Sequence, residues 1–403
     1  MLHRILALAL VLNTGLAVSA ADWPQFRGPN GSGVSTEQNL PTQFTEKEGV
    51  RWKAELPARG VSSPIVANGK VFVSCSSGTR DDRLHLLAFD ATTGKKLWHR
   101  QLSATGNTNA HPKTCMAANT PVADAKAVYC LYATGDLVAF DHAGALLWYR
   151  SLTGDYPTIT NQVGAASSPV LYQNKLIVPM DNAGESFIAA LDVANGKNLW
   201  KTERPRDINW ATPTVRELNS DDAELLLQGP KELTVFDLKT GKKKWNASAP
   251  SSASSATLAD GLLIAPTGGV TVFKTGEGKL EEVWKSPKYR TGYSSPLYYE
   301  GRVYAANPAG VVYCADAKTG KSIWEERMAG KQTFSASPVA GDGKVYVLSE
   351  TGRLVTFKAT GDGDSAEILG TSELKEEGLA TPAISGGAIF IRTDKNLWCI
   401  GKK

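Results

Sequence analysis

The 403-residue sequence lacks the patterns that mark several common enzyme classes. Its five histidines form no HExxH motif and no short ligand pair, so metal catalysis has little support. A GxSxG motif is also missing, which excludes the nucleophile elbow of the α/β-hydrolases. After residue 20 we find no helix-length pattern of apolar residues. What is abundant is glycine, at 38 residues, which fits a turn-dense all-β chain.

Positive charge is not concentrated in any part of the chain. The formal net charge is +4, and the lysines and arginines mostly stand singly or in turns such as GKK. Binding to nucleic acid requires a clustered basic stripe that can neutralise phosphates. We therefore expect no nucleic-acid partner.

One long apolar run lies at the amino end. MLHRILALALVLNTGLAVSA (residues 1–20) combines a positive flank at Arg4, an apolar core and small residues before Ala21. This is the pattern of a cleaved signal peptide, and it is too short for a convincing membrane anchor. No cysteine follows the cleavage point, so a bacterial lipid anchor has no support. We expect a periplasmic or secreted protein without a membrane span.

A nine-residue phrase recurs along the chain. It reads DATTGKKLW (90–98), DVANGKNLW (192–200), DLKTGKKKW (237–245) and DAKTGKSIW (316–324), with a shorter DHAGALLW at 141–148. The Asp can cap a turn and the Gly can supply a positive φ, so the phrase predicts a hairpin whose returning strand carries the Trp. A Trp at this place has enough apolar area to fill the gap between one repeat and the next. The repeated carboxylates are therefore interpreted as turn caps and not as a metal array.

A second phrase counts the repeats. Ser/Thr-Pro precedes an apolar strand seven times, with prolines at 64, 121, 169, 213, 296, 338 and 382, and SSATL around Ala256 is an eighth copy without Pro. Each copy is followed by a turn, an alternating strand, the strand that ends in Asp and the strand that carries Trp. Four short strands at roughly 40-residue spacing are typical of propeller blades. The sequence predicts an all-β, eight-bladed β-propeller with four-stranded blades.

The last blade is incomplete at the carboxy end. The eighth unit stops after its third strand, whereas GVRWKAEL near the amino end places Trp52 twelve residues before Pro64, the interval that separates Trp284 from Pro296. We expect this strand to complete the last blade and close the ring, which removes the edges of an open array. The predicted organisation is a signal peptide (1–20), an N-terminal segment (21–50) and one propeller domain (51–403).

Two units depart from the phrase. The fifth has Lys274 where Asp is expected, and the seventh has no Trp, so stacking should be looser there.

Export would permit disulfides among the five cysteines, none of which has a CxxC spacing. Most of them could instead be small buried apolar side chains. If a disulfide forms, we expect it between Cys75 and Cys115, because the end of one unit's second strand and the link to the next unit open on the same face.

Together with the opening ADWPQFRGPNGSGVS (21–35), these repeats make the chain resemble the secreted bacterial pyrroloquinoline-quinone-like (PQQ-like) propellers. D-x-x-T-G-x-x-x-W is the repeat signature of that family, and WPQFRGPNGSG (23–33) resembles the opening of its exported single-propeller members. The resemblance implies a propeller over essentially the whole mature chain. It leaves function open, because the family includes both quinone-dependent alcohol dehydrogenases and the outer-membrane-protein assembly lipoprotein B.

The chain departs from both kinds of relative. The dehydrogenases of the family hold the quinone between a Trp and a disulfide of adjacent cysteines, with Ca²⁺ ligands and an Asp base beside it. Here no two cysteines are adjacent and no CxxCH haem motif occurs. The lipid-accepting cysteine of the assembly lipoprotein is missing as well.

Candidate site residues lie in the long links between units, which should surround one end of the central channel. The longest are residues 103–120, 151–165, 203–212, 286–295 and 328–337. A planar anionic ligand could stack on an aromatic ring there and pair with Arg, or the rings could simply seal the channel mouth. The candidates are Trp210, which lies outside the repeat phrase, and Arg206, Asn209, Arg290, Tyr293, Gln332, Phe334 and His111, with Lys331 nearby.

Two functions fit these observations. The first is an exported, non-enzymatic and monomeric binding or scaffold module that contacts a protein or a cell-envelope component, with no cofactor and no metal. Short, turn-like loops and the lack of a convincing catalytic set favour it. The second is a dehydrogenase of alcohols or polyols that uses PQQ with Ca²⁺, with Trp210 as stacking platform and Asp207 as base. That alternative depends on the fold family alone.

Overall fold

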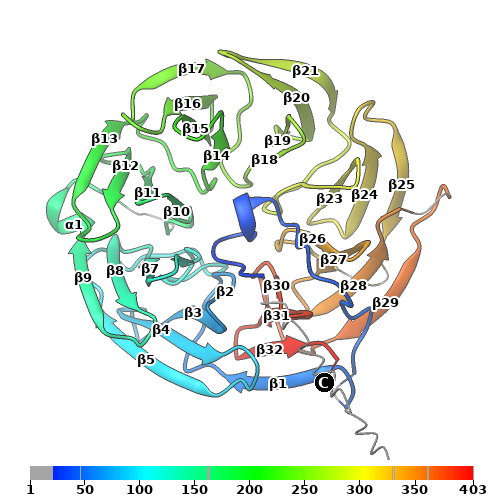
Figure 1. Ribbon diagram of the computed structural model, residues 1–403, viewed down its shortest axis with the longest axis horizontal. Helices are drawn as coiled ribbons and strands as arrows, with labels where there is room; N and C mark the ends of the chain where they lie inside the picture. Colours follow the sequence, from blue (N-terminus) through cyan, green and yellow to red (C-terminus); the bar gives the residue numbers. More distant parts are fainter. Residues whose placement is uncertain are drawn as a thin grey trace, which may run out of the picture.

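The structure is a computed structural model that describes residues 21–45, 47–160, 164–328, 330, 332–360 and 363–402. Within these ranges, eight antiparallel four-stranded sheets stand around a central axis as the blades of a closed ring (Figure 1). The predicted eight-bladed propeller is confirmed. The predicted signal peptide, residues 1–20, lies outside the described residues.

Seven blades follow the chain from an inner strand at the channel to an outer strand at the rim (Figure 1). Blade 1 contains β2 (Ile65–Ala67), β3 (Lys70–Ser77), β4 (Arg83–Asp90) and β5 (Lys96–Ser103). Blade 2 contains β6 (Val122–Ala123), β7 (Ala127–Leu131), β8 (Asp136–Asp141) and β9 (Leu146–Ser151). Blade 3 contains β10 (Val170–Tyr172), β11 (Lys175–Met180), β12 (Phe187–Asp192) and β13 (Asn198–Glu203). Blade 4 contains β14 (Thr214–Glu217), β15 (Ala223–Gln228), β16 (Leu233–Asp237) and β17 (Lys243–Ala247).

The remaining blades keep the same order. Blade 5 contains β18 (Thr257–Ala259), β19 (Leu262–Pro266), β20 (Val270–Gly276) and β21 (Lys279–Ser286). Blade 6 contains β22 (Leu297–Tyr299), β23 (Arg302–Ala306), β24 (Val311–Asp316) and β25 (Ser322–Arg327). Blade 7 contains β26 (Val339–Gly341), β27 (Lys344–Leu348), β28 (Arg353–Lys358) and β29 (Ile368–Glu373), and blade 8 contains β30 (Ala383–Ser385), β31 (Ala388–Arg392), β32 (Asn396–Ile400) and β1 (Val50–Glu55). A 3-10 turn, η1 (Pro29–Gly31), and a one-turn helix, α1 (Leu152–Asp155), complete the described elements.

The Asp-to-Trp phrase forms the joint between neighbouring blades. Asp90 caps its turn by accepting from the backbone N–H of Thr93 at 2.8 Å. Gly94 has a φ of 71° and lies under the ring of Trp52 from the preceding blade, so closely that a Cβ on Gly94 would be 2.5 Å from that ring. The indole N–H of Trp52 donates to the carbonyl of Ala91 at 3.0 Å. The Gly therefore allows the positive φ of the turn, and its lack of a side chain leaves room for the ring of the neighbouring Trp.

The same joint recurs around the ring. A Trp lies over the turn Gly of the next blade in the pairs Trp98 and Gly144, Trp148 and Gly196, Trp200 and Gly241, and Trp284 and Gly320. In each pair the indole N–H also donates to a backbone carbonyl of that next blade, at 2.8 to 3.2 Å. The expected stacking role of the repeated Trp agrees with this geometry.

The joint between blades 4 and 5 lacks two of these features, in agreement with the looser stacking expected at the fifth unit. The buried indole N–H of Trp245 has no hydrogen-bond partner among the described residues. Gly278 in the blade 5 turn faces open space instead of a Trp ring. Between blades 6 and 7, Trp324 stacks on Phe357 with ring centroids 5.3 Å apart. The looser stacking expected from the missing Trp of the seventh unit concerns the joint with blade 8 and stays a prediction.

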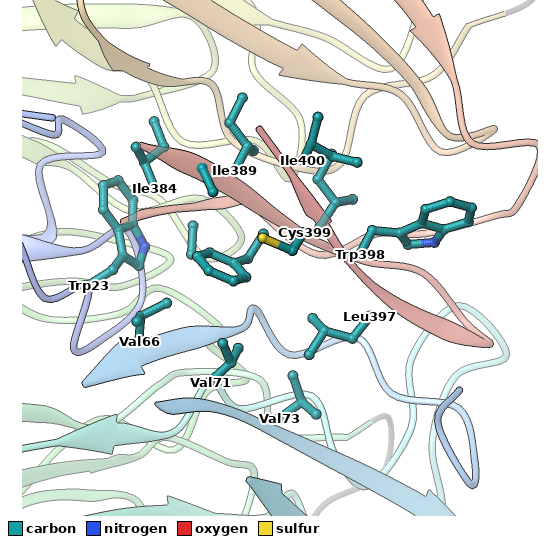
Figure 2. Packing of buried hydrophobic residues seen from close by; sticks show 14 of the residues in the cluster. Trp23, Val66, Val71, Val73, Ile384, Ile389, Leu397, Trp398, Cys399 and Ile400 are labelled. Atoms are coloured by element: carbon teal, nitrogen blue, oxygen red, sulfur yellow. The ribbon is translucent and has the colours of Figure 1, made fainter. Parts of the chain in front are cut away.

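The N-terminal strand closes the ring as expected. β1 pairs antiparallel with β32, and Trp52 stands opposite Cys399. Figure 2 shows the core at this closure, where Leu397 of blade 8 faces Val71 and Val73 of blade 1.

The N-terminal segment crosses one end of the channel (Figure 1). We call this end the hairpin face, because the segment bonds there to the turns between the first two strands of blades 1 and 7, at Asn68 and Asp342. Trp23 forms a β-bridge with Val66 of blade 1 and is 1% exposed. Arg27 lies fully buried near the axis and donates to Thr257 Oγ1 and to the carbonyl of Pro296, both at 2.7 Å. Burial lowers the pKa of Arg27 to about 9. The segment thus ties blade 1 to blades 5 and 6.

Cys75 and Cys115 are buried and free, so the disulfide expected between them is not formed in this structure. Arg392 Nη2 donates to Cys75 Sγ at 3.5 Å. Burial raises the pKa of the Cys75 thiol, and nearby Cys115 adds to the rise. The pairing stays a prediction.

Candidate functional site

The Ser/Thr-Pro phrases converge on the central channel and form a ring of hydroxyl groups. The backbone N–H of Ser63 donates to Thr120 Oγ1 of the next blade at 3.0 Å, and the same bond recurs at the six following steps as far as Thr381, with N···O distances of 2.8 to 3.1 Å. The ring consists of Ser63, Thr120, Ser168, Thr212, Ser255, Ser295, Ser337 and Thr381. Ser255 keeps its place although Ala256 has replaced the following Pro. All eight phrases therefore keep the Ser or Thr hydroxyl, whereas one of them has lost the Pro.

A cavity of about 260 Å³ lies at the opposite end of the channel from the hairpin face, among the links between blades. We call this end the link face and the cavity the mouth pocket. Its wall is a second ring, made by the residue two positions before each hydroxyl: Val61, Ala118, Ala166, Trp210, Ala253, Tyr293, Ser335 and Leu379. Phe26 of the N-terminal segment also lines it, so the segment blocks the channel from the other side. The pocket is blind and its wall is largely apolar.

The link at residues 103–120 narrows the mouth. Lys113 Nζ contacts both carboxylate oxygens of Glu350 in blade 7, at 2.9 and 3.0 Å. Arg59 Nη1 donates to the carbonyl of Pro112 at 2.9 Å. These contacts hold the link across the pocket and place a cation at its rim.

Three of the predicted site residues line the mouth pocket: Trp210, Tyr293 and His111. The half-buried Trp210 donates its indole N–H to the carbonyl of Gly164 at 2.8 Å, which fixes the ring. Tyr293 is 52% exposed. His111 is exposed, and its Nδ1 accepts from the backbone N–H of Lys113 at 3.1 Å. Two aromatic rings thus belong to the wall of an apolar cavity, with Ala253 between them in the ring.

Asn209 and Phe334 have packing roles instead. The amide of Asn209 donates to Asp181 Oδ2 and to the carbonyl of Gln228, both at 2.8 Å. Phe334 is 0% exposed and belongs to the core between blades 6 and 7. Both follow from the alternating direction of side chains along an extended link.

The other candidates lie outside the lining. Arg206 and Arg290 are exposed and do not line the pocket. Gln332 accepts a hydrogen bond from Thr351 at 2.9 Å, away from the cavity. Lys331 lies outside the described residues.

The mouth pocket does not fit PQQ with Ca²⁺. Its described lining contains no carboxylate and no cysteine. Over the described chain, no three His, Cys, Asp or Glu residues are placed to hold a metal ion together. Ca²⁺ takes several oxygen ligands, usually including carboxylates. Asp207, the base of the alternative hypothesis, lies outside the lining, with Lys231 Nζ 3.5 Å away.

Sequence reasoning missed two parts of this site. The hydroxyl ring was visible as a Ser or Thr in all eight phrases, even where Pro is lost. Phe26 left no comparable signal, because it lies in a segment that does not repeat.

Neither described helix has the length and apolar character needed to cross a membrane.

Two kinds of known protein, BamB and polyvinylalcohol dehydrogenase, are similar to this chain in sequence. The family model described as outer membrane protein assembly factor BamB matches residues 34–204 and 184–403. BamB of Bordetella pertussis is 23% identical over 355 residues, which cover 87% of this chain and 75% of that protein. A polyvinylalcohol dehydrogenase of a Pseudomonas species is 25% identical over 334 residues, 70% of this chain, and the match spans about half (47%) of that enzyme.

Solved structures give the same result. Quinohemoprotein alcohol dehydrogenase from Comamonas testosteroni superposes with a TM-score of 0.70 at 14% identity, covering 95% of this chain and 81% of the enzyme. BamB from Moraxella catarrhalis superposes with a TM-score of 0.60 at 16% identity, covering 88% of this chain and 97% of BamB. At such identities the likeness concerns the fold alone. Because the family model matches the chain from residue 34 to residue 403, the protein belongs to the PQQ-like propeller family described as outer membrane protein assembly factor BamB.

Proposed function

We propose that the protein is an exported, non-enzymatic propeller that binds another protein or a cell-envelope component through its link face. The mouth pocket carries this proposal, because it is a blind cavity of about 260 Å³ with a largely apolar wall and no carboxylate or thiol in its described lining. Such a cavity can take an apolar side chain from a partner. No carboxylate belongs to its described lining, and Glu350 at the rim is engaged by Lys113 and Ser335.

The surroundings of the pocket resemble the centre of a protein interface. The wall of the pocket includes the exposed Tyr293 and the half-buried Trp210, and aromatic residues at a desolvated centre contribute most of the binding energy in many interfaces. His111 and Lys113 form a polar rim, as such interfaces usually have. A partner that inserts an apolar side chain into the pocket, against Trp210 or Tyr293, fits this arrangement.

The relatives support a protein partner without deciding it. Several matched proteins are named as assembly factors of outer membrane proteins, and others as alcohol dehydrogenases. The sequence of residues 1–20 favours export. The misfit between the mouth pocket and a quinone with Ca²⁺ weighs against the dehydrogenase.

Site-specific photo-crosslinking tests the proposal in the intact cell envelope. A photoreactive amino acid in place of Tyr293 should give an adduct of defined mass, and adding Trp210→Ala should reduce it because one wall of the pocket is lost. The matched control replaces Ile368, which is 47% exposed on outer strand β29. Equal adducts at both positions, or none at position 293, would contradict binding at the link face.

A further inference from the structure

A second and larger cleft, of about 1000 Å³, opens at the hairpin face. It lies between the inner strands β10, β14 and β18 of blades 3 to 5, beside the N-terminal segment. Phe26 lines both this cleft and the mouth pocket, so it separates the two. We call this second cavity the blade 4 cleft.

A charged cluster is buried in the wall of the blade 4 cleft. Glu224 in β15 accepts from Arg216 in β14 and pairs with Lys244 of β17, whose Nζ lies 2.7 Å from its carboxylate. The side chains of Glu224 and Arg216 are only 2% and 8% exposed. Burying charges is costly even when they are paired, so stability alone is a weak reason for this cluster.

The cluster is also a departure from the repeat. In blades 1, 3 and 6 the second-strand residue opposite the turn Asp is a cation: Lys70, Lys175 or Arg302. In blade 4 it is Glu224, which stands opposite Asp237. Like charges directly across a strand pair are unfavourable. Blade 4 therefore lacks the cation–Asp pair of these blades. Its Glu224 is neutralised instead by two cations, Arg216 and Lys244.

Two buried donors in the residues that line the cleft have no acceptor among the described residues. Arg216 Nη1 and Nη2 each donate to the carbonyl of Gly276 at 3.1 Å, but its Nε has no partner within the described ranges. Nε of Arg27 is likewise buried without a described partner. Both arginines line the cleft and are more than nine-tenths buried. The two guanidinium groups therefore give the depth of the cleft a positive character.

The rim of the cleft has the opposite character. Its exposed carboxylates belong to Glu217, Asp222, Asp260 and Glu277. They accept hydrogen bonds and repel anions. Tyr172 on β10 adds a half-buried aromatic ring.

These groups select the chemistry of the ligand. An anion would suit the arginines but meet repulsion at the rim, and a cation would suit the rim but meet repulsion at the arginines. A neutral polyhydroxylated molecule can accept from Arg216 and donate to the carboxylates, while a sugar ring packs on Tyr172. We propose that the blade 4 cleft binds a neutral oligosaccharide, independently of whatever the mouth pocket binds.

Calorimetric titration of the mature protein with maltotriose, cellotriose and N-acetylated chitotriose tests this. At least one trisaccharide should bind. Tyr172→Ala should weaken its affinity by about tenfold or more through the lost ring contact, and Glu277→Gln should weaken it less through one lost acceptor. Both residues have exposed or half-buried side chains, so the fold should survive. The control, Tyr293→Ala in the mouth pocket, should leave sugar affinity unchanged.

Failure of all three sugars to bind would overturn the proposal, as would binding that neither cleft variant alters. Trilysine is titrated in parallel, and binding of trilysine alone would indicate a basic peptide and overturn the sugar.

Discussion

Gly241 shows how one residue of the repeat meets two separate demands. Its φ of 71° is a left-handed conformation that glycine adopts at low cost, and a Cβ there would lie 2.4 Å from the ring of Trp200. Gly261, in a turn of blade 5, has almost the same φ of 72° but nothing within 4 Å of its Cβ position. The two positions therefore separate backbone strain from the contact between blades.

Replacement of each glycine by Ala measures that difference. Gly261→Ala should cost about 1 kcal/mol, the strain of a left-handed alanine. Gly241→Ala should cost about 1–3 kcal/mol more, because the Trp200 ring must move. Melting of the two variants followed by circular dichroism is the measurement, and equal melting temperatures would mean that the Trp joint contributes nothing.

A second residue-scale effect concerns the paired histidines of blade 1. His85 Nδ1 and His99 Nε2 are 2.9 Å apart, and Ser77 Oγ is 2.8 Å from His85 Nε2. Burial, followed by the nearby His99 and Arg83, lowers the pKa of His85 to about 4, from an ordinary value of 6.5. The unfolded chain therefore takes up the proton first. Stability is complete above the ordinary pKa and is lost as pH falls from about 6.5 toward 4.

Thermal melts across this pH window test the histidine pair. In the wild-type protein the melting temperature should fall on acidification, and His85→Gln should make the fall smaller. His111→Gln, at an exposed position, is the control and should follow the wild type. A pH dependence that His85→Gln leaves unaltered would exclude His85 as its source.

At the scale of single elements, β1 is the strand that closes the ring. It pairs with β32 and presents Trp52 to blade 1, so it covers a strand edge and makes one joint. Deletion of residues 21–56 should lower the melting temperature or cause aggregation. An unchanged melt would refute the role of this strand in closure.

The hairpin of blade 5 should be the first to open. Trp245 lacks a described hydrogen-bond partner for its indole, whereas Trp148 and Trp200 in blades 2 and 3 are bonded to the next blade at 2.8 and 3.0 Å. Local openings concentrate where such contacts are few. Hydrogen exchange followed by mass spectrometry should show faster exchange in β20 and β21 than in β11 and β12. Slower exchange in blade 5 would contradict this ranking.

At the scale of the whole molecule, the repeat made the fold predictable, because each blade carries the same local signals and the interval from Trp52 to Pro64 identifies the closing strand. The site was only partly predictable. Trp210 and its neighbour Asn209 lie in the same link, yet one lines the mouth pocket and the other is buried against Asp181. The sequence locates a link but not the direction of each side chain. Phe26 and the blade 4 cleft depend on how a non-repeated segment crosses the ring, which no local pattern reports.

Addition of PQQ and Ca²⁺ to the purified protein tests most directly whether the mouth pocket is a binding surface or a catalytic site. Tryptophan fluorescence and dye-linked oxidation of an alcohol are followed together, in the wild type and in Trp210→Ala. A binding propeller predicts no saturable quenching that depends on Trp210, and no turnover. Saturable quenching that disappears in Trp210→Ala, accompanied by alcohol oxidation, would contradict the proposed function and support the dehydrogenase.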